Sequence, residues 1–180
     1  MGGSGAISCA EASQDNSYRD AVDTYGAALE RLARAYEADP EKRRDLLQEI
    51  HFQLWRSFQQ FDARCSVRTW VYRVAHNVAA SHVIRERRDF TSLVSLEELE
   101  KLPSKSGPGV EDRMNLERLS NLIQKLKPLD RQVIVSYLED MDAAAIGEIT
   151  GLSPASVAMR VHRIKRILAR WFHEGGGHGE

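Results

Sequence analysis

A long interval without glycine constrains this chain more than any other feature of its sequence. No glycine occurs between Gly26 and Gly107, and Pro40 and Pro103 are the only prolines in that interval. Inside a helix glycine costs roughly 1 kcal/mol and proline roughly 3 kcal/mol, so an interval that lacks them suits long helices. The sustained alternation of apolar and polar residues that marks strands is not found. The sequence therefore predicts an all-α fold.

Composition limits the class of protein further. Of the 180 residues, 42% are hydrophobic and 28% are charged, values that are ordinary for one or two soluble domains. No apolar run approaches the roughly 18 residues of a membrane helix, and the start MGGSGAIS lacks the features of a signal peptide. We therefore expect a soluble, cytoplasmic protein without membrane insertion.

Patterns that would indicate catalysis or metal binding are missing from the sequence. Its two cysteines, Cys9 and Cys65, cannot form a disulfide framework or a four-ligand zinc site. None of the six histidines falls in an HExxH motif, and no nucleophile stands at a meaningful spacing from a base. We expect no metal site, no cofactor and no enzymatic activity, and we expect the Cys65 thiol to be inert.

Three helices are predicted in the N-terminal half. The first covers about residues 25–37, where Tyr25, Leu29, Leu32 and Tyr36 form one apolar stripe, and residues 1–24 are expected to be a disordered leader. Asp39 and Pro40 then have the order of an N-cap and a first helical residue. The second helix is predicted to bury Leu47, Ile50, Leu54, Phe58 and Phe61. The third, after a Ser66 cap and up to about Arg88, is predicted to bury Val67, Val71, Val74 and Val78.

Residues 90–112 have the character of a linker between two domains, which we place at residues 25–89 and 113–173. Ser95 and Glu98 have the spacing of a capping box, so SLEELEKL can form a short helical turn, whereas PSKSGPG is a flexible break. Beyond the linker lie two amphipathic stretches. The first carries Met114, Leu119, Leu122, Ile123 and Leu126, and the second, opened by Pro128, carries Val133, Ile134 and Leu138. Residues 174–180 are predicted to be a disordered tail.

The segment after Asp142 predicts a helix-turn-helix. Asp142 can cap a short helix that ends at Thr150, Gly151 suits a turn with positive φ, and Ser153 and Pro154 can start a second helix. We expect the buried side to consist of Ile146, Ile149, Leu152, Val157, Val161, Ile164 and Leu168. A basic second helix after a glycine turn is the geometry that seats a helix in the DNA major groove, although an αα-hairpin with solvated arginines has the same pattern.

The basic residues gather in two places although the formal net charge is only −1. Residues 64–88 contain six arginines and one acid, and residues 153–172 contain five basic residues and no acid. Acidic residues concentrate before Ala63 and between Asp89 and Asp112. Two basic faces on a background that repels polyanions predict weak DNA binding by the chain alone and strong binding when a partner positions it.

Two outer faces in the N-terminal half are unusual for a plain helical bundle. The second helix is expected to expose Asp45, Gln48, Glu49, Phe52 and Trp55, a mixture that suggests a second partner. The third is expected to expose Arg68, Tyr72, Arg73, His76 and Asn77, which suit unstacked bases and phosphates. An ordinary surface asparagine remains an alternative for Asn77.

Three strings of the sequence resemble the bacterial sigma-70 family of RNA polymerase initiation factors, in its small extracytoplasmic-function group. They are DLLQEIHFQLW, RTWVYRVAHNVAASHVIRERR and LKPLDRQVIVSYLEDMDAAAIGEITGLSPASVAMRVHRIKR, within about residues 25–172. The resemblance implies two helical domains, σ2 and σ4, on a flexible linker. It also implies a factor that binds core RNA polymerase and promoter DNA, melts the minus-ten element and binds the minus-thirty-five element.

The resemblance further implies roles for individual residues. The core polymerase contacts, on the β' clamp helices, would be Asp45, Leu47, Gln48, Glu49 and Trp55. The minus-ten contacts would be Phe61, Asp62, Ala63, Arg64, Ser66, Arg68, Trp70, Tyr72, Arg73, Asn77 and Ser81. The minus-thirty-five contacts would be Ser156, Met159, Arg160, His162, Arg163 and Arg166. Ala158 and Met159 depart from the family pattern, which usually has a basic or small polar residue there.

Several alternatives stay open at this point. Trp171 and Phe172 can extend the core or bind the β flap of the polymerase. The acidic residues Glu97, Glu98, Glu100, Glu111 and Asp112 can thread the RNA-exit path or form a solvated tether. An anti-sigma factor can cover the same surfaces. A polymerase-independent helix-turn-helix transcriptional regulator is the alternative function, and it would bind its operator without polymerase.

Overall fold

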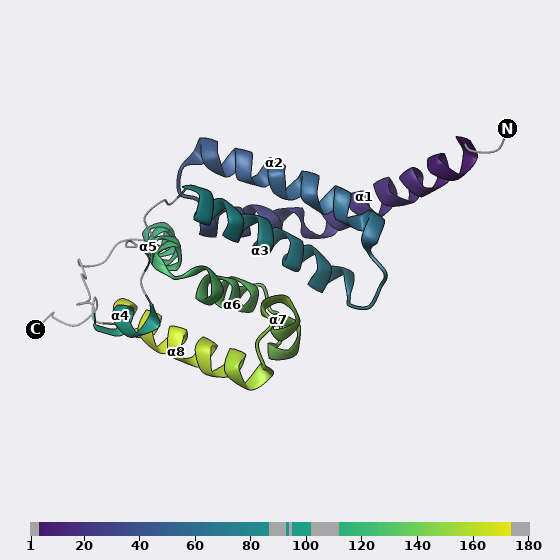
Figure 1. The fold of residues 1–180 in the computed structure, drawn as a ribbon. Coiled ribbons are helices and arrows are strands. Elements are labelled where there is room, and N and C mark those ends of the chain that lie inside the picture. The colour runs from purple at the N-terminus through teal and green to yellow at the C-terminus, as the bar shows by residue number, and fades with distance from the viewer. Residues whose placement is uncertain (1–3, 87–92, 94, 102–111, 174–180) are drawn as a thin grey trace, which may run out of the picture. The chain divides into compact units, whose positions relative to one another are not determined.

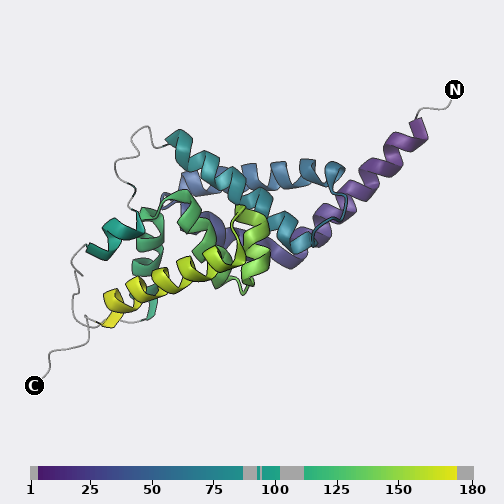
Figure 2. The ribbon, with the colours of Figure 1, turned by 60° about the horizontal axis from the view of Figure 1, so that its bottom comes forward.

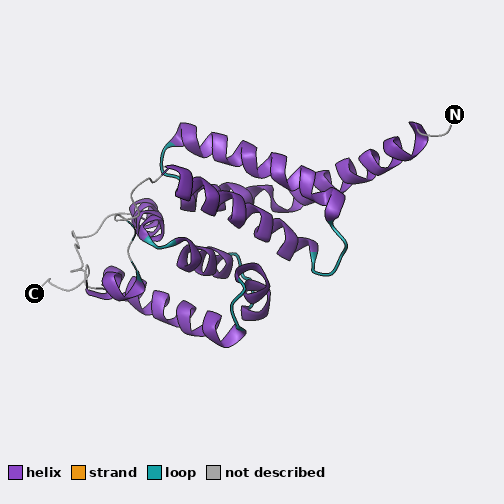
Figure 3. Ribbon diagram, viewed as in Figure 1, coloured by secondary structure: helices purple, strands orange, loops and turns teal. Residues whose placement is uncertain are grey.

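The computed structural model describes residues 4–86, 93, 95–101 and 112–173. Every regular element among these residues is helical, as the sequence predicted (Figure 3). Contacts divide the chain into two compact units, Met1–Glu86 and Arg87–Glu180. Unit 1 contains α1 (Ser4–Tyr36), α2 (Pro40–Ser57), a 3₁₀ turn (Phe58–Gln60) and α3 (Val67–Glu86). Unit 2 contains α4 (Leu96–Lys101), α5 (Asp112–Lys125), α6 (Pro128–Leu138), α7 (Ala143–Thr150) and α8 (Pro154–His173) (Figure 1).

The core of unit 1 forms where α1, α2 and α3 pack against one another. The predicted stripe on α1 is confirmed for Leu29, Leu32 and Tyr36, which are buried, whereas Tyr25 is half-buried. Small residues on α3 allow the three helices to approach closely, because an alanine side chain takes up little space between two helix backbones. The core side chains of α2 and α3 are Leu46, Ile50, Leu54, Val71, Ala75, Ala79 and Val83.

Helix α1 begins much earlier than the sequence predicted, so the expectation of a disordered leader over residues 1–24 is wrong from Ser4 onward. Figure 2 shows its first turns projecting past α2 and α3. Toward the N-terminus, the buried apolar residues among the described side chains of α1 end at Ala21. Before this residue, polar side chains hold α1 against α2. The Gln14 amide donates to the Trp55 carbonyl oxygen at 2.8 Å, and the Tyr18 hydroxyl lies 3.1 Å from His51 Nδ1.

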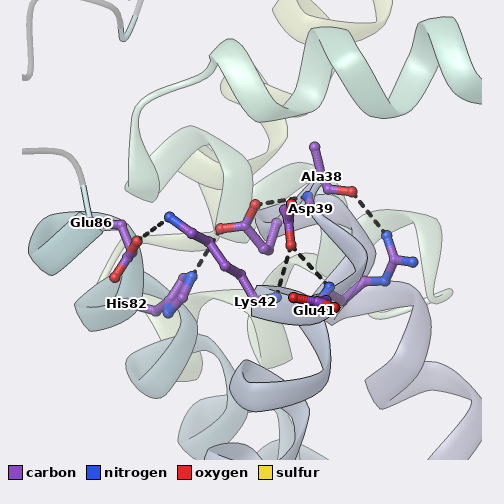
Figure 4. A network of polar contacts seen from close by, with 8 residues as sticks. Ala38, Asp39, Glu41, Lys42, His82 and Glu86 are labelled. Atoms are coloured by element: carbon purple, nitrogen blue, oxygen red, sulfur yellow. Dashed lines mark hydrogen bonds and ion pairs between the residues drawn. The ribbon is translucent and has the colours of Figure 1, made fainter.

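The corner between α1 and α2 is fixed by its own side chains and tied to the end of α3 (Figure 4). The Asp39 carboxylate accepts hydrogen bonds from the backbone N–H groups of Glu41 and Lys42, which confirms the predicted N-cap. Lys42 pairs with Glu86 at 2.5 Å, and Glu37 lies 3.0 Å from His82 Nε2. These contacts hold the C-terminal end of α3 beside the start of α2.

The predicted stripe of α2 is confirmed for Ile50, Leu54 and Phe58, but Leu46 is buried instead of Leu47, which is half-buried like Phe61. The predicted face of α3 is rotated in the structure. On α3 the buried side includes Tyr72 and His76, which were expected on the outer face, whereas Val67 is exposed and Val74 and Val78 are half-buried. The spacing of the valines predicted the wrong buried side of α3, because the helix has a row of valines and a row of alanines and either row can face the core. The close packing of three helices favours the alanine side.

Unit 2 contains the predicted helix-turn-helix behind a capped linker helix. Ser95 and Glu98 form the expected capping box, since the Ser95 N–H donates to the Glu98 carboxylate and the Glu98 N–H donates to Ser95 Oγ. The predicted linker is therefore not all tether: α4 packs against α8 (Figure 1). The break at residues 103–109 and the tail at 174–180 lie outside the described residues.

The core of unit 2 follows most of the predicted pattern, although Leu119 and Leu152 are only half-buried and the side chain of Met114 lies outside the described residues. Leu122, Ile123, Leu126, Val133 and Ile134 are buried as expected. Leu138 is exposed because it lies at the end of α6, and Ile167 is buried in place of the predicted Leu168. Both Ile167 and Leu168 lie one turn beyond Ile164, so the pattern alone does not choose between them. Arg131 is fully buried and donates to the carbonyl oxygens of Gln124 and Leu126, which closes the end of α5.

Buried His76 predicts an acid-sensitive unit 1. Its Nδ1 lies 3.0 Å from the Tyr36 hydroxyl, and burial lowers its pKa from 6.5 to about 3. The unfolded chain therefore takes up a proton below pH 6.5 that the folded chain refuses, so stability is kept above pH 6.5 and lost as the pH falls toward 3. When the pH falls from 7 to 5, the free energy of unfolding should decrease in both proteins. Because glutamine stays neutral, we expect this decrease to be about 2 kcal/mol smaller in His76→Gln than in the unsubstituted chain.

Urea unfolding at the two pH values measures this difference. Trp55 and Trp70 report on unit 1 when Trp171 is replaced by phenylalanine in both proteins. The other histidines are the same in both chains, so their contributions cancel. Equal loss of stability on acidification in the two proteins would show that His76 does not titrate in this way.

Candidate nucleic-acid interface

The helix-turn-helix has the local geometry that the sequence predicted. The Asp142 carboxylate accepts from the Ala145 N–H at 2.8 Å, and Gly151 adopts φ 76° directly after α7. Ser153 Oγ accepts from the Ser156 N–H and starts α8. A Cβ built on Gly147 would lie 2.7 Å from the Leu152 carbonyl oxygen. Only glycine therefore fits where α7 meets the turn, and this close approach fixes the angle between the two helices.

The outward side of α8 carries the predicted cations along one groove. The groove has a volume of about 640 Å³ and is lined by both α8 and α4. Met159 is 74% exposed, His162 and Arg166 are exposed, and Ser156, Arg160 and Arg163 are half-buried. All six residues predicted to contact the minus-thirty-five element line it: Ser156, Met159, Arg160, His162, Arg163 and Arg166. The structure thus brings this predicted set together.

A buried carboxylate holds one of these cations. The guanidinium of Arg160 donates to Asp130, whose side chain is only 8% exposed at the start of α6. Arg160 is 36% exposed, so part of its guanidinium still faces solvent. A charge-assisted bond to a fixed, buried partner restricts the many rotamers of an arginine. Asp130 therefore decides where the exposed part of Arg160 points.

The linker helix supplies a second carboxylate. Arg163 donates to Glu97 of α4, a pair that is 31% and 63% exposed. The backbone N–H of Glu97 and then the Arg163 guanidinium lower the pKa of the Glu97 carboxyl. Of the acidic linker residues, Glu97 is thus engaged with α8 rather than freely solvated. Glu111 and the side chains of Glu100 and Asp112 lie outside the described residues.

The loop between α2 and α3 in unit 1 is held by short-range bonds. Asp62 accepts from both the backbone N–H and the side chain of Arg64, and the bond from the Arg64 side chain is the main reason that the Asp62 pKa is lowered. Ala63 between them adopts φ 58°. Ser66 Oγ accepts from the Thr69 N–H at 3.0 Å, which confirms Ser66 as the cap of α3. Cys65 is half-buried as a free thiol.

Aromatic residues predicted to contact the minus-ten element are used largely in packing. The Phe61 and Trp70 ring centroids lie 5.4 Å apart, and the Trp70 indole N–H donates to Ser57 Oγ at 2.9 Å. Tyr72 is 1% exposed against Tyr25 and His76. The expectation that Tyr72 faces outward is therefore wrong, because its position on α3 faces the core. Phe61 and Trp70 hold the loop on the helix.

Asn77 and Ser81 are both exposed, one turn apart on α3. They line a groove of about 400 Å³ whose opposite wall is α2, with Glu49, Gln53 and Ser57. Val74, Val78 and Arg85 complete the lining. The groove therefore joins two sets that the sequence analysis kept separate, since Glu49 was assigned to polymerase and Asn77 and Ser81 to DNA. Its volume is of the size that small ligand groups occupy.

The outward side of α2 is exposed only in part, because Glu49 and Trp55, both expected to be exposed, are half-buried and Trp55 has a partner on α1. Asp45 and Gln48 are exposed, and Phe52 is 52% exposed. The Trp55 indole N–H donates to Asp15 at 2.8 Å, and the Trp55 backbone accepts from Gln14. The N-terminal part of α1 thus fixes the position of this tryptophan.

Asp15 and Asp130, which hold Trp55 and Arg160, were not predicted from the sequence. Neither has a local signal: Asp15 lies in what was expected to be a disordered leader, and Asp130 has the pattern of an ordinary first-turn acid. No side chains among the described residues form a group of histidines, cysteines or carboxylates that could hold a metal ion. In the same part of the chain, no helix combines the length and apolarity needed to cross a membrane.

Comparison with protein families gives two matches. Residues 21–89 match the family described as Sigma-70 region 2, and residues 116–168 match Sigma-70, region 4. The two matches together span more than half of the chain, in the order that the three strings predicted. The region 2 match argues against a polymerase-independent regulator, since region 2 belongs to sigma factors.

Curated relatives agree with the two family matches. The ECF RNA polymerase sigma factor SigW of Bacillus subtilis (strain 168) is 27% identical over 165 residues, covering 86% of this chain and 88% of SigW. The RNA polymerase sigma factor CnrH of Cupriavidus metallidurans is 27% identical over 175 residues, 91% of each chain. The ECF RNA polymerase sigma-E factor of Escherichia coli (strain K12) is 30% identical over 116 residues, covering 63% of this chain and 59% of that protein.

A solved structure shares the fold. It is that of CnrH in complex with the cytosolic domain of CnrY, with a TM-score of 0.66 and 20% identity, covering 93% of this chain and 94% of that one. Sequence, helix-turn-helix geometry and family matches lead to the same conclusion. The chain belongs to the sigma-70 family as an ECF sigma factor, a non-enzymatic initiation factor that directs RNA polymerase to promoters.

Proposed function

We propose that unit 1 of this sigma factor docks on core polymerase and opens the minus-ten element, while α8 of unit 2 reads the minus-thirty-five element as duplex. Two observations support this assignment: all six predicted minus-thirty-five contacts gather along one groove of unit 2, and Asn77 and Ser81 lie together in a groove of unit 1. The conclusion that the chain is a sigma factor does not depend on these assignments. They state which residues carry out its steps.

The α2–α3 groove is suited to a base that has left the DNA stack. The Asn77 amide offers donors and an acceptor to a base edge, and Ser81 adds a hydroxyl one turn away. Extruding a base costs a few kcal/mol, and contacts in a pocket return about 1–3 kcal/mol for each stacked base. Melting can therefore proceed on binding energy alone, without ATP.

The loop and α3 would hold the separated strand by its phosphates. The exposed or half-buried groups there are the cations Arg64, Arg68 and Arg73 and the hydroxyl of Ser66, while Asp62, an anion, acts by holding Arg64. Arginines bind phosphate strongly, and the polar cap residues offer short-range hydrogen bonds. In this proposal Phe61 and Trp70 support the loop, and Ala63 allows its turn. Tyr72 acts from the core of unit 1 and makes no DNA contact.

The polymerase contacts are proposed on the outward side of α2, against the β' clamp helices: Asp45, Leu47, Gln48 and Glu49, with Trp55 fixed by Asp15. An exposed apolar side chain such as Phe52 within a polar rim is the usual composition of an interaction hot spot. The β flap is proposed to meet Trp171 and Phe172, whose side chains lie outside the described residues. Because core polymerase is cytoplasmic, we place the protein there.

An anti-sigma factor is proposed as a further partner. The related CnrH was solved in complex with the cytosolic domain of CnrY, and this chain shares the fold of that complexed protein. The exposed side chains Phe52, Ile84 and Met159 give such a partner apolar surface to cover.

Asn77→Ala tests the base-reading groove. We expect run-off transcription from the cognate promoter to fall about tenfold, because a hydrogen bond to a base edge contributes about 1–2 kcal/mol. Binding to core polymerase should stay unchanged. Asn121→Ala, a change of the same residue type at an exposed position on α5, is the matched control. Full transcription by the Asn77 variant would remove the proposed role.

Glu49→Lys tests the docking face. Reversing this charge should weaken binding to core polymerase at least tenfold in a pull-down or titration, since like charges brought together at an interface cost several kcal/mol. Glu30→Lys makes the same charge change on an exposed position of α1 and should bind normally. If both variants bind core polymerase alike, the proposed face is wrong.

Asp130→Ala tests whether the buried carboxylate positions Arg160. We expect discrimination between the cognate minus-thirty-five element and a mutated one to fall about tenfold in holoenzyme, the range of one good base contact. Arg160→Ala should have the same effect, and the double variant should be no worse than Arg160→Ala alone, because Asp130 acts through Arg160. If the losses of the two single variants add up in the double variant, Asp130 does not act through Arg160. Thermal unfolding of each variant shows whether a loss of discrimination comes from an unstable domain instead.

A further inference from the structure

The position of the linker helix on α8 suggests that the reading surface is covered in the chain by itself. Leu96 and Glu97 of α4, and Ser95 directly before it, line the same groove as the six proposed minus-thirty-five contacts. Leu93 and Leu96 are buried, at 6% and 3% exposed, so apolar contacts as well as charge hold the segment in place. The capping box between Ser95 and Glu98 gives this short helix a fixed start.

We propose that α4 is an acidic cover for the DNA-reading face of α8, which the DNA duplex must displace in order to bind. The proposal rests on the role proposed above for α8. Glu97 occupies Arg163 as a phosphate oxygen would, with a carboxylate oxygen on the guanidinium. DNA and α4 therefore compete for the same cation.

Space gives a second reason for displacement. The major groove is about 12 Å wide, and a helix with its side chains is about 10–12 Å across. One helix fills the groove, so α8 cannot enter it on the side where α4 packs against it. The side that α4 covers is the one with Arg163, because Glu97 reaches this residue.

The cover is weak enough to be displaced. The Glu97–Arg163 pair is partly exposed, and exposed ion pairs shift an equilibrium by only a few-fold. The helix has six residues and depends on packing for its stability. DNA that offers several phosphates, or a partner that draws the linker away, can therefore open the reading face. This accounts physically for the expectation that the free chain binds DNA poorly.

Charge-neutral variants of two neighbouring glutamates test the cover. Glu97→Gln removes the partner of Arg163, whereas Glu98→Gln removes the same charge from the same helix and keeps a side chain that can complete the capping box. The probe is a fluorescent 24-base-pair duplex of mixed sequence, titrated with the full chain in the absence of polymerase at several KCl concentrations.

We expect Glu97→Gln to bind the duplex about threefold more tightly than Glu98→Gln. The slope of log K against log salt should be the same for both variants, because α4 is displaced and Arg163 reaches a phosphate in both complexes. Leu96→Ala, which weakens the apolar hold of α4, should increase affinity further. Equal affinities for the two glutamine variants would overturn the proposal.

Hydrogen exchange provides a measurement that does not depend on affinity. The amides of α4 should exchange faster when the duplex is saturating, because α4 leaves α8, while the amides of α6 stay protected. Unchanged or increased protection of α4 in the complex would overturn the proposal even if Glu97→Gln binds more tightly.

A last variant separates this proposal from the role of α8. In the Glu97→Gln background, where the Glu97 carboxylate no longer competes for Arg163, Arg163→Ala should weaken duplex binding if α8 is the DNA-reading helix. If Arg163→Ala has no effect, α8 does not read DNA and the proposed function fails together with the cover. If Arg163→Ala weakens binding while Glu97→Gln and Glu98→Gln behave alike, α8 reads DNA and only the cover is wrong.

Discussion

The rotation of each helix about its own axis is the constraint on which the functional surfaces of this protein depend. With 3.6 residues per turn, a shift of one position moves a side chain by about 100°, from the core to solvent. On α3 this places Tyr72 and His76 inside and Asn77 and Ser81 outside. The rotation is set where three helices pack closely, so the same core residues that stabilise unit 1 decide what it can offer to DNA.

Charge has a comparable role in unit 2. The basic face of α8 is not a set of free arginines, because Asp130 holds Arg160 and Glu97 holds Arg163. The two carboxylates differ in their setting. Asp130 is buried and belongs to the fixed frame of the domain, whereas Glu97 is largely exposed on a short helix. A buried carboxylate can fix the orientation of an arginine, whereas an exposed carboxylate can release its arginine to another anion.

In unit 1, polar contacts likewise fix the position of functional side chains, and they come from the N-terminal part of α1. Asp15 and Tyr18 contact Trp55 and His51 on α2, so a segment without an apolar stripe still has a defined position. These polar contacts join α1 to the positions of α2 next to its core residues Ile50 and Leu54. The surface proposed to meet polymerase is therefore built from two helices, although only one of them carries the recognisable string.

Local chemistry explains what could be predicted from the sequence. The all-α class, the caps at Asp39, Ser66 and Asp142, the capping box at Ser95 and the turn at Gly151 each depend on a few neighbouring residues, and all are present. The order of the strings was enough to indicate the family. Each of these features is determined by short-range hydrogen bonds or by a single backbone conformation, which a sequence displays directly.

Only the tertiary structure decided which faces are buried and which charges meet. Leu46 replaces Leu47 in the core, Asp130 reaches Arg160 across 30 positions, and Glu97 reaches Arg163 across 66. Such contacts depend on how the helices pack, and this packing is determined by the surfaces of all the helices together. A stripe of valines predicts a helix but does not determine its rotation, since close approach of three backbones can favour a row of alanines instead.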